Sequence, residues 1–78
     1  MLENGDIAEL LIREAEQADG HREKAFRRAA HAAFMWPEEA AALVAAGRSL
    51  TELDGIGPSL AGRLLRWIDS LLVGVYEK

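Results

Sequence analysis

A chain of 78 residues, 50% of them apolar, is long enough for one small domain with a modest core. It holds no cysteine, which excludes a disulfide framework and a zinc site of the cysteine type. The chain shows no apolar run of membrane-spanning length and no signal-peptide pattern at its acidic N-terminus, so we expect a cytoplasmic monomer without membrane association. The formal net charge of −4 argues mildly against nucleic acid as a partner, although a local basic surface can still bind phosphate.

The first predicted helix spans residues 6–18. Asp6 is the expected N-cap, with Glu9 three residues later as in a capping box, and Asp19 and Gly20 are the stop signal. Its apolar stripe repeats at helical spacing and comprises Ile7, Ala8, Leu11, Ile12, Ala15 and Ala18.

The second predicted helix spans residues 22–35 and has one apolar and one basic face. The apolar face comprises Phe26, Ala29, Ala30 and Ala33. The basic face comprises Lys24, Arg27, Arg28 and His31. That basic face is either a solvated surface or a phosphate-binding stripe, and periodicity alone favours the solvated surface.

A proline and a glycine delimit the third predicted helix. Pro37 suits the first helical position, and Glu38 and Glu39 follow in the first turn, where the helix dipole favours acids. Gly47 is expected to end this helix.

A short helix over residues 50–53, capped by Ser49, leads into two glycines and a last helix. The last helix is predicted to begin at Pro58 and to run to about Leu72. Its expected buried stripe comprises Leu60, Ala61, Leu64, Leu65, Ile68, Leu71 and Leu72. We therefore expect an all-α fold: a compact bundle of four main helices plus a one-turn helix, formed by residues 1–78 as one domain.

The stretch Gly55-Ile56-Gly57 carries the clearest chemical signal. Its glycines allow positive φ angles and a close approach of another molecule to the backbone. Pro58 then leaves N–H groups free at a helix N-terminus, which is a favourable anion site. Ile56 is expected to plug the space between the flanking helices, and Ala61 to let them pack closely.

Tryptophan and histidine side chains carry weaker signals. Trp36 and Trp67 could stack on bases, but their apolar neighbours favour placement in the core or at its edge. His21 and His31 lack a cluster of partner ligands, so we expect exposed histidines rather than a metal site.

Residues 50–70 resemble a helix-hairpin-helix motif, which binds the DNA backbone without reading base sequence. The positions that carry this resemblance are Leu53, Gly55, Ile56, Gly57 and Ala61. The alternative is an ordinary glycine turn between two helices. Three stretches taken in order, residues 4–11, 21–30 and 53–64, are similar to the small N-terminal domain of family X DNA polymerases, called the 8-kDa or lyase domain in the polymerase beta-like members. In bacteria such a domain can precede a polymerase core or a PHP-type phosphoesterase domain, so the resemblance implies a covalently linked enzyme domain as a possible partner.

The resemblance implies roles for individual positions. Backbone N–H groups of Gly55, Ile56 and Gly57 would hold a DNA phosphate. Backbone carbonyls of Thr51, Leu53 and Ile56 match positions where the family can bind a monovalent cation, Na⁺ or K⁺; no other cofactor is implied.

Other positions match or depart from the family's grip on a 5′-phosphate. His21 and Arg22 match residues near the end of a gapped strand. Phe26 stands where tyrosine is frequent and Ser59 where a lysine can occur, so a hydroxyl and a charge are lost.

Arg63 is the sharpest departure, because lyase-active members carry a Schiff-base lysine there. That chemistry needs an amine that can lose its proton, and an arginine guanidinium stays protonated. The only lysines are Lys24 and Lys78, and neither matches this position. We therefore expect the isolated domain to have no deoxyribose-phosphate lyase activity and not to be an enzyme, although membership of a longer enzyme stays open.

Sequence-independent binding of the DNA backbone at nicks, gaps or ends, in repair or replication, is the expected function. The main predicted contact surface comprises Gly55, Ile56, Gly57, Ser59, Arg63 and Arg66. The second predicted contact surface comprises His21, Arg22, Lys24, Arg27 and Arg28. The alternative is a protein-interaction or structural module that kept the fold and lost strong DNA affinity, which an exposed apolar patch near Trp67, Leu71 and Tyr76 would favour.

Overall fold

Four α-helices and one 3-10 turn form the backbone of residues 2–76 in the computed structural model, which describes side chains for residues 2–70. The elements are α1 (Asn4–Gln17), α2 (Gly20–Ala33), α3 (Ala40–Ala45), the 3-10 turn η1 (Leu50–Glu52) and α4 (Pro58–Tyr76). Residues 2–76 contain no strand. The predicted all-α class, with four main helices and one short helical turn, is confirmed. No helix within this range is apolar over a sufficient length to cross a membrane.

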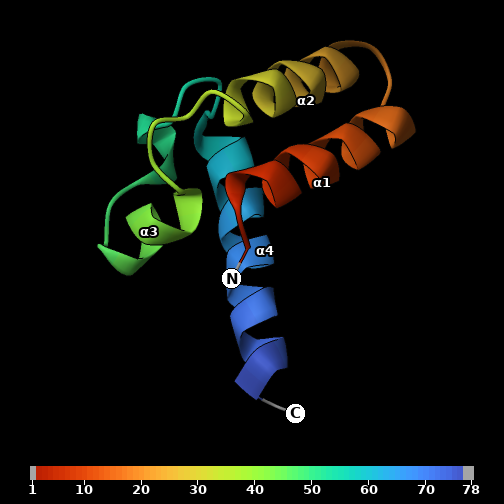
Figure 1. Ribbon diagram of the computed structural model, residues 1–78. Coiled ribbons are helices and arrows are strands. Elements are labelled where there is room, and N and C mark those ends of the chain that lie inside the picture. Colours follow the sequence, from red (N-terminus) through yellow and green to blue (C-terminus); the bar gives the residue numbers. More distant parts are fainter. Residues whose placement is uncertain (1, 77–78) are drawn as a thin grey trace.

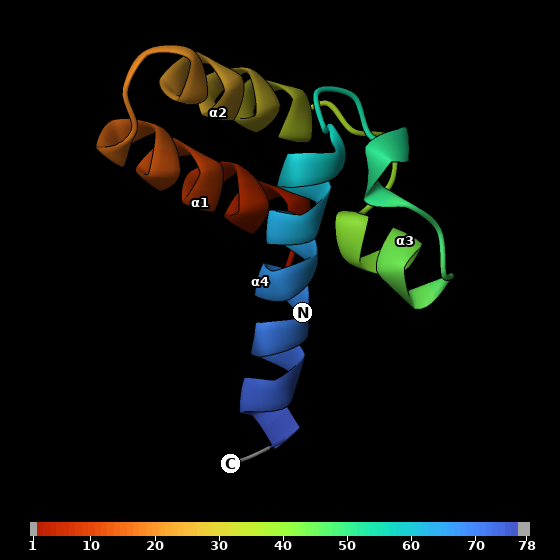
Figure 2. The ribbon, with the colours of Figure 1, turned by 180° about the vertical axis from the view of Figure 1, so that it is seen from behind.

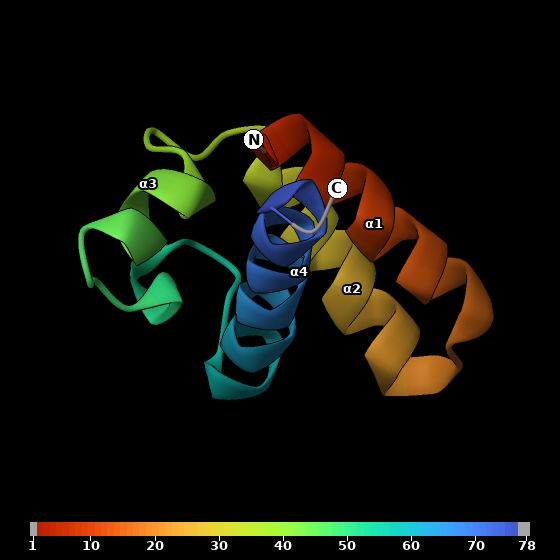
Figure 3. The same cartoon turned by 90° about the horizontal axis from the view of Figure 1, so that it is seen from below.

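Helices α1 and α2 lie side by side and run antiparallel (Figure 1). The N-terminal end of α4 lies beside the C-terminal end of α2 (Figure 2). Helix α3 lies on the other side of α4 from the α1–α2 pair (Figure 3). The C-terminal half of α4 extends away from the other helices, so the body of the molecule holds α4 by its N-terminal half (Figure 1).

The core is formed by the apolar stripes that helical periodicity predicts. Ile7, Leu11, Leu43 and Leu64 are its largest fully buried side chains. Smaller side chains line α2, where Ala29, Ala30 and Ala33 are buried and let neighbouring elements approach its backbone. Trp36 is buried and Trp67 partly buried, as predicted.

Leu65 is the clearest error in the predicted stripe of α4. Its side chain is 41% exposed, because it lies at the edge of the core beside an open groove. Leu60 and Ala61 are only partly buried. The predicted burial of Leu71 and Leu72 falls outside the residues whose side chains are described.

Helix α1 begins before its predicted start. The N-cap is Glu3, and Asp6 is the third helical residue, whose Oδ2 accepts a hydrogen bond from the Glu3 N–H at 3.0 Å. The predicted capping box of Asp6 and Glu9 is therefore wrong. Asp6 is not the N-cap but the residue three positions after it, whose carboxylate accepts the N-cap N–H.

Helix α2 begins and ends about two residues earlier than predicted. Asp19 occupies the N-cap position with an extended backbone. At the other end Phe34 is the C-cap, and Trp36 precedes a proline, which disfavours helical backbone at that position.

The predicted start of α3 at Pro37 is wrong, because a residue from α1 caps this helix. The helix begins at Ala40, whose N–H donates to Asn4 Oδ1 at 2.8 Å. Asn4 Nδ2 donates to the Glu38 carbonyl at 2.8 Å, and the Asn4 N–H donates to Glu39 Oε1 at 3.0 Å. Asn4 is the one buried polar side chain among the described residues.

The predicted glycine stop after α3 is confirmed. Gly47 has a φ of +74°, and its N–H donates to the Val44 carbonyl at 3.0 Å. The Arg48 N–H donates to the Leu43 carbonyl at 2.9 Å, which completes a Schellman motif.

The predicted Ser49 cap of the short helix is confirmed by a hydrogen bond from the Thr51 N–H to Ser49 Oγ at 3.2 Å. Helix α4 begins at Pro58 as predicted but runs past Leu72 to Tyr76. Gly74 is the weakest helix former in that extension, at a cost of about 1 kcal/mol relative to alanine, and it does not end the helix.

Candidate nucleic-acid interface

Residues 53–57, which we call the glycine turn, connect η1 to α4. The Ile56 N–H donates to the Leu53 carbonyl at 3.2 Å, and Gly55 between them has a φ of +81°. A type II turn requires positive φ at this position, and glycine adopts it without steric cost. Gly57 does not have a positive φ, so the predicted need for that conformation holds for Gly55 alone.

The glycine turn packs directly on the alanine face of α2. A Cβ added at Gly55 would lie 3.2 Å from Ala32 Cβ and 3.6 Å from Ala29 Cα. Ile56 is buried, as expected for a plug between the two helices. In contrast, a Cβ at Gly57 would meet nothing within 4 Å, so this glycine leaves the backbone open to an approaching molecule.

Trp36 holds the glycine turn in place through one side-chain hydrogen bond. Its Nε1–H donates to the Asp54 carbonyl at 2.9 Å. The indole is also part of the buried core. The turn is therefore fixed before any ligand arrives, which reduces the conformational cost of binding.

Backbone N–H groups at the start of α4 lack internal acceptors. The Ala61 N–H makes the first bond of this helix, to the Gly57 carbonyl at 2.9 Å. Within residues 2–70, no hydrogen bond uses the N–H of Gly55, Gly57 or Ser59. These donors lie at the positive end of the helix dipole, which favours an anion. The Ile56 N–H, predicted to hold phosphate, is instead bonded to the Leu53 carbonyl and is not open.

A groove of about 360 Å³, the turn groove, joins the glycine turn to α2. Its lining comprises Arg22, Ala25, Phe26, Gly55, Gly57, Pro58, Ser59, Leu60 and Arg63. Arg22 comes from the second predicted contact surface, and Gly55, Gly57, Ser59 and Arg63 come from the first. The two surfaces are therefore contiguous through Arg22.

Arg63 is already engaged by two neighbouring side chains, Glu14 and Phe26. Its Nη1 donates to Glu14 Oε1 of α1, and its guanidinium lies over the Phe26 ring at 5.3 Å from the centroid. The side chains of Arg63 and Glu14 are 33% and 29% exposed. Sequence reasoning missed Glu14, which looks like any helix-surface acid and lies far from Arg63 along the chain.

Arg66 continues the basic surface along α4. It lines a hollow of about 240 Å³ together with Arg63, Trp67 and Ser70. Arg66 forms no ion pair with any residue of the range 2–70. Within the described part of the chain, Arg66 is therefore an unpaired cation next to the engaged Arg63.

Most of the second predicted contact surface faces solvent away from the turn groove. His21, Lys24 and Arg28 are exposed and do not line the groove. Arg27 is exposed and pairs with Glu23, with Nε 2.9 Å from Oε2. His21 and His31 are both exposed, and the described residues hold no group of three side chains that could bind a metal ion.

The carbonyl groups predicted to hold a monovalent cation surround the glycine turn. Carbonyl oxygens are donors that hard cations prefer. The Leu53 carbonyl accepts the Ile56 N–H, and its second lone pair stays available. The donor types therefore fit Na⁺ or K⁺ at Thr51, Leu53 and Ile56, which stays a prediction.

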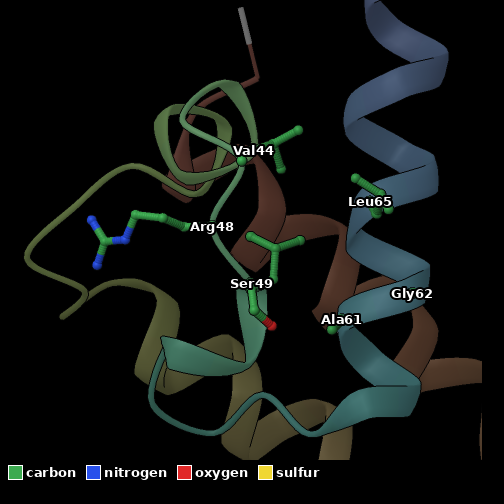
Figure 4. A pocket seen from close by; sticks show the side chains of 8 residues that line it. Val44, Arg48, Ser49, Ala61, Gly62 and Leu65 are labelled. Atoms are coloured by element: carbon green, nitrogen blue, oxygen red, sulfur yellow. The ribbon is translucent and has the colours of Figure 1, made fainter.

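A second groove, of about 350 Å³, separates α4 from the segment after α3 (Figure 4). Val44 and Leu65 point into it from opposite sides, and the Arg48 guanidinium points away from α4. Arg48 pairs with Glu52 and, at 2.9 Å, with Glu38. The hydrogen bonds that Arg48 donates, first to Glu52 and then to Glu38, raise the pKa of Arg48, and the bond to Glu52 lowers the pKa of that carboxyl. This ion cluster joins the segments before and after α3 to η1, and none of its members lines the turn groove.

Comparison with known proteins identifies no related sequence or structure. The chain matches no protein-family model, and neither a curated protein nor a solved structure gives a significant match. The resemblance to the family X polymerase domain therefore depends on the three sequence stretches alone.

Proposed function

We propose that this domain binds the DNA backbone, without reading base sequence, through the turn groove. The observation that carries the proposal is that Gly55, Gly57 and Ser59, whose N–H groups have no acceptor within residues 2–70, line one groove together with Arg22. Phosphate contacts of this kind position a protein on DNA without specifying bases. Nicks, gaps and ends in repair or replication are the expected targets, as the resemblance implies.

Affinity is expected to be modest, and the dissociation constant should rise with salt along a shallow slope. The formal net charge is −4, and the guanidinium of Arg63 is paired with Glu14. Few cations are then left to neutralise DNA phosphates and release their counterions, so the loss of any one of them should lower the affinity measurably. A linked polymerase or phosphoesterase domain would add further contacts.

Lyase chemistry is not part of the proposal. Arg63 cannot form an imine with a sugar aldehyde because a guanidinium does not deprotonate under physiological conditions. Treatment of an abasic DNA substrate with borohydride should therefore trap no covalent adduct at Arg63.

A titration with DNA, followed by amide NMR, tests the proposal. Gapped, nicked and intact duplexes carrying 5′-phosphates would be added at several salt concentrations. The amides of Gly55, Gly57 and Ser59 should shift, and the dissociation constant should rise with salt. Absence of any shift in the glycine turn at low salt would overturn DNA binding by this domain.

Protein interaction is the second candidate, favoured by exposed apolar side chains. Phe34 and Met35 at the end of α2 are 63% and 82% exposed, and Leu65 borders the groove of Figure 4. The patch predicted near Trp67 is not decided, since Trp67 is half-buried and the side chains of Leu71 and Tyr76 lie outside the described residues.

A further inference from the structure

The ion pair between Glu14 and Arg63 differs from the others among residues 2–70. It connects α1 to α4, and its side chains are the least exposed of those in ion pairs. Partial burial reduces screening by salt, so this pair interacts more strongly than an exposed one. The pair also borders the turn groove, because Arg63 lines it.

A phosphate that enters the turn groove must compete with this carboxylate. The guanidinium carries five N–H donors, but Glu14 occupies one of them and Phe26 covers a face. A second anion at Arg63 would also be repelled by the Glu14 charge at close range. Because the pair with Glu14 offsets its charge, Arg63 becomes an effective phosphate contact only when Glu14 is displaced.

We propose that Glu14 is an internal competitor for Arg63 that lowers the affinity of the turn groove for the DNA backbone. The inference rests on the proposed function and assigns Glu14 a role in setting affinity. In the unaltered domain Arg63 makes no phosphate contact, and Arg22 and the open N–H groups carry the binding. Removal of the Glu14 charge adds one cation to the contact surface.

Glu14→Gln tests this directly, with Glu16→Gln as the matched control. Both variants remove one negative charge from α1, but Glu16 is exposed and forms no ion pair among the described residues. On a gapped duplex with a 5′-phosphate at low salt, E14Q should bind about fivefold tighter, and E16Q less than about twofold tighter. Equal effects of the two variants would overturn the proposal.

The salt dependence separates a new phosphate contact from a general change in charge. The slope of log K against log[salt] should steepen by about 0.9 in E14Q, because one more phosphate is neutralised. Arg63→Gln should leave the slope unchanged in the original chain and should abolish the extra slope in the E14Q background. A slope that changes equally in both backgrounds contradicts the competition. Circular dichroism would verify that each variant stays folded.

A titration with inorganic phosphate distinguishes failure of this inference from failure of the proposed function. The readout is the chemical shift of the Arg63 Nε–H, which should move in E14Q at a phosphate concentration that leaves the original chain unchanged. If no variant binds DNA but this shift occurs, the proposed function fails and the competition stands. If DNA binds and the shift is the same in both proteins, the competition fails and the proposed function stands.

Discussion

The N-terminal ends of α3 and α4 differ in what their first N–H groups meet. At α3 the Ala40 N–H donates to the buried Asn4 side chain from another helix. At α4 the N–H of Ser59 has no acceptor within residues 2–70, and the turn groove opens in front of it. A helix end offers its donors to a ligand only where the tertiary structure has not supplied an internal acceptor. The open end of α4 is thus the candidate binding site, and the closed end of α3 is part of the framework.

Loss of the Asn4 cap should produce the largest effect on stability. Asn4→Ala leaves the Ala40 N–H and the Glu38 carbonyl without their partner, at a cost of about 2–3 kcal/mol. Urea denaturation measures this free energy of unfolding. Gln17→Ala, at an exposed site on the same helix, is the control and should change stability by less than about 0.5 kcal/mol. Equal losses would mean that Asn4 does not cap α3.

Gly55→Ala should destabilise the domain by about 1–2 kcal/mol, because alanine is strained at the positive φ found there. The added Cβ would also press on Ala32 at 3.2 Å. The measurement is again urea denaturation. An unchanged midpoint would show that the glycine turn can relax without cost, which would contradict a preformed site.

Gly57→Ala should separate binding from stability. Its backbone does not require positive φ, and the added methyl group meets no atom within 4 Å, so stability should change by less than about 0.5 kcal/mol. The methyl group would stand where a phosphate approaches the backbone, and affinity for gapped duplex should fall about tenfold. Fluorescence anisotropy measures the affinity. Unchanged binding would remove Gly57 from the contact surface.

The contrast between the two helix ends also marks how far sequence reasoning reaches. The glycine turn was predicted because its glycines, its proline and the flanking periodicity are local signals that agree with one another. The start of α3 was predicted wrongly at Pro37, since a local proline rule cannot anticipate an asparagine contributed by α1. Glu14 was missed for the same reason, because its partner Arg63 comes from a distant helix. The sequence thus predicted the helices themselves, but it did not predict side-chain contacts between helices that are distant along the chain.

Arg22→Gln should weaken DNA binding without changing the fold. Arg22 lines the turn groove, so its loss should lower affinity about fivefold and reduce the salt slope by about 0.9. Lys24→Gln removes the same charge from an exposed site on α2 outside the groove and should have a smaller effect on both. A larger effect of K24Q would move the contact surface to the outer face of α2.

The smallest effect is expected at the ion cluster of Arg48, Glu38 and Glu52, none of which lines the turn groove. The hydrogen bond from Arg48 lowers the pKa of Glu52 below its ordinary value of 4.5 in the folded protein. A depressed pKa in the folded state contributes stability above the unfolded pKa, and that contribution is lost as the pH falls through the lowered value. The Tm of the original chain should therefore exceed that of Glu52→Gln slightly at pH 6, and the difference should shrink as the pH falls below 4.5 and through the lowered pKa. DNA affinity at pH 6 should be the same for both proteins, because no member of the cluster lines the turn groove. A loss of both affinity and stability in E52Q would mean that the N-terminal ends of α3 and α4 are coupled rather than independent.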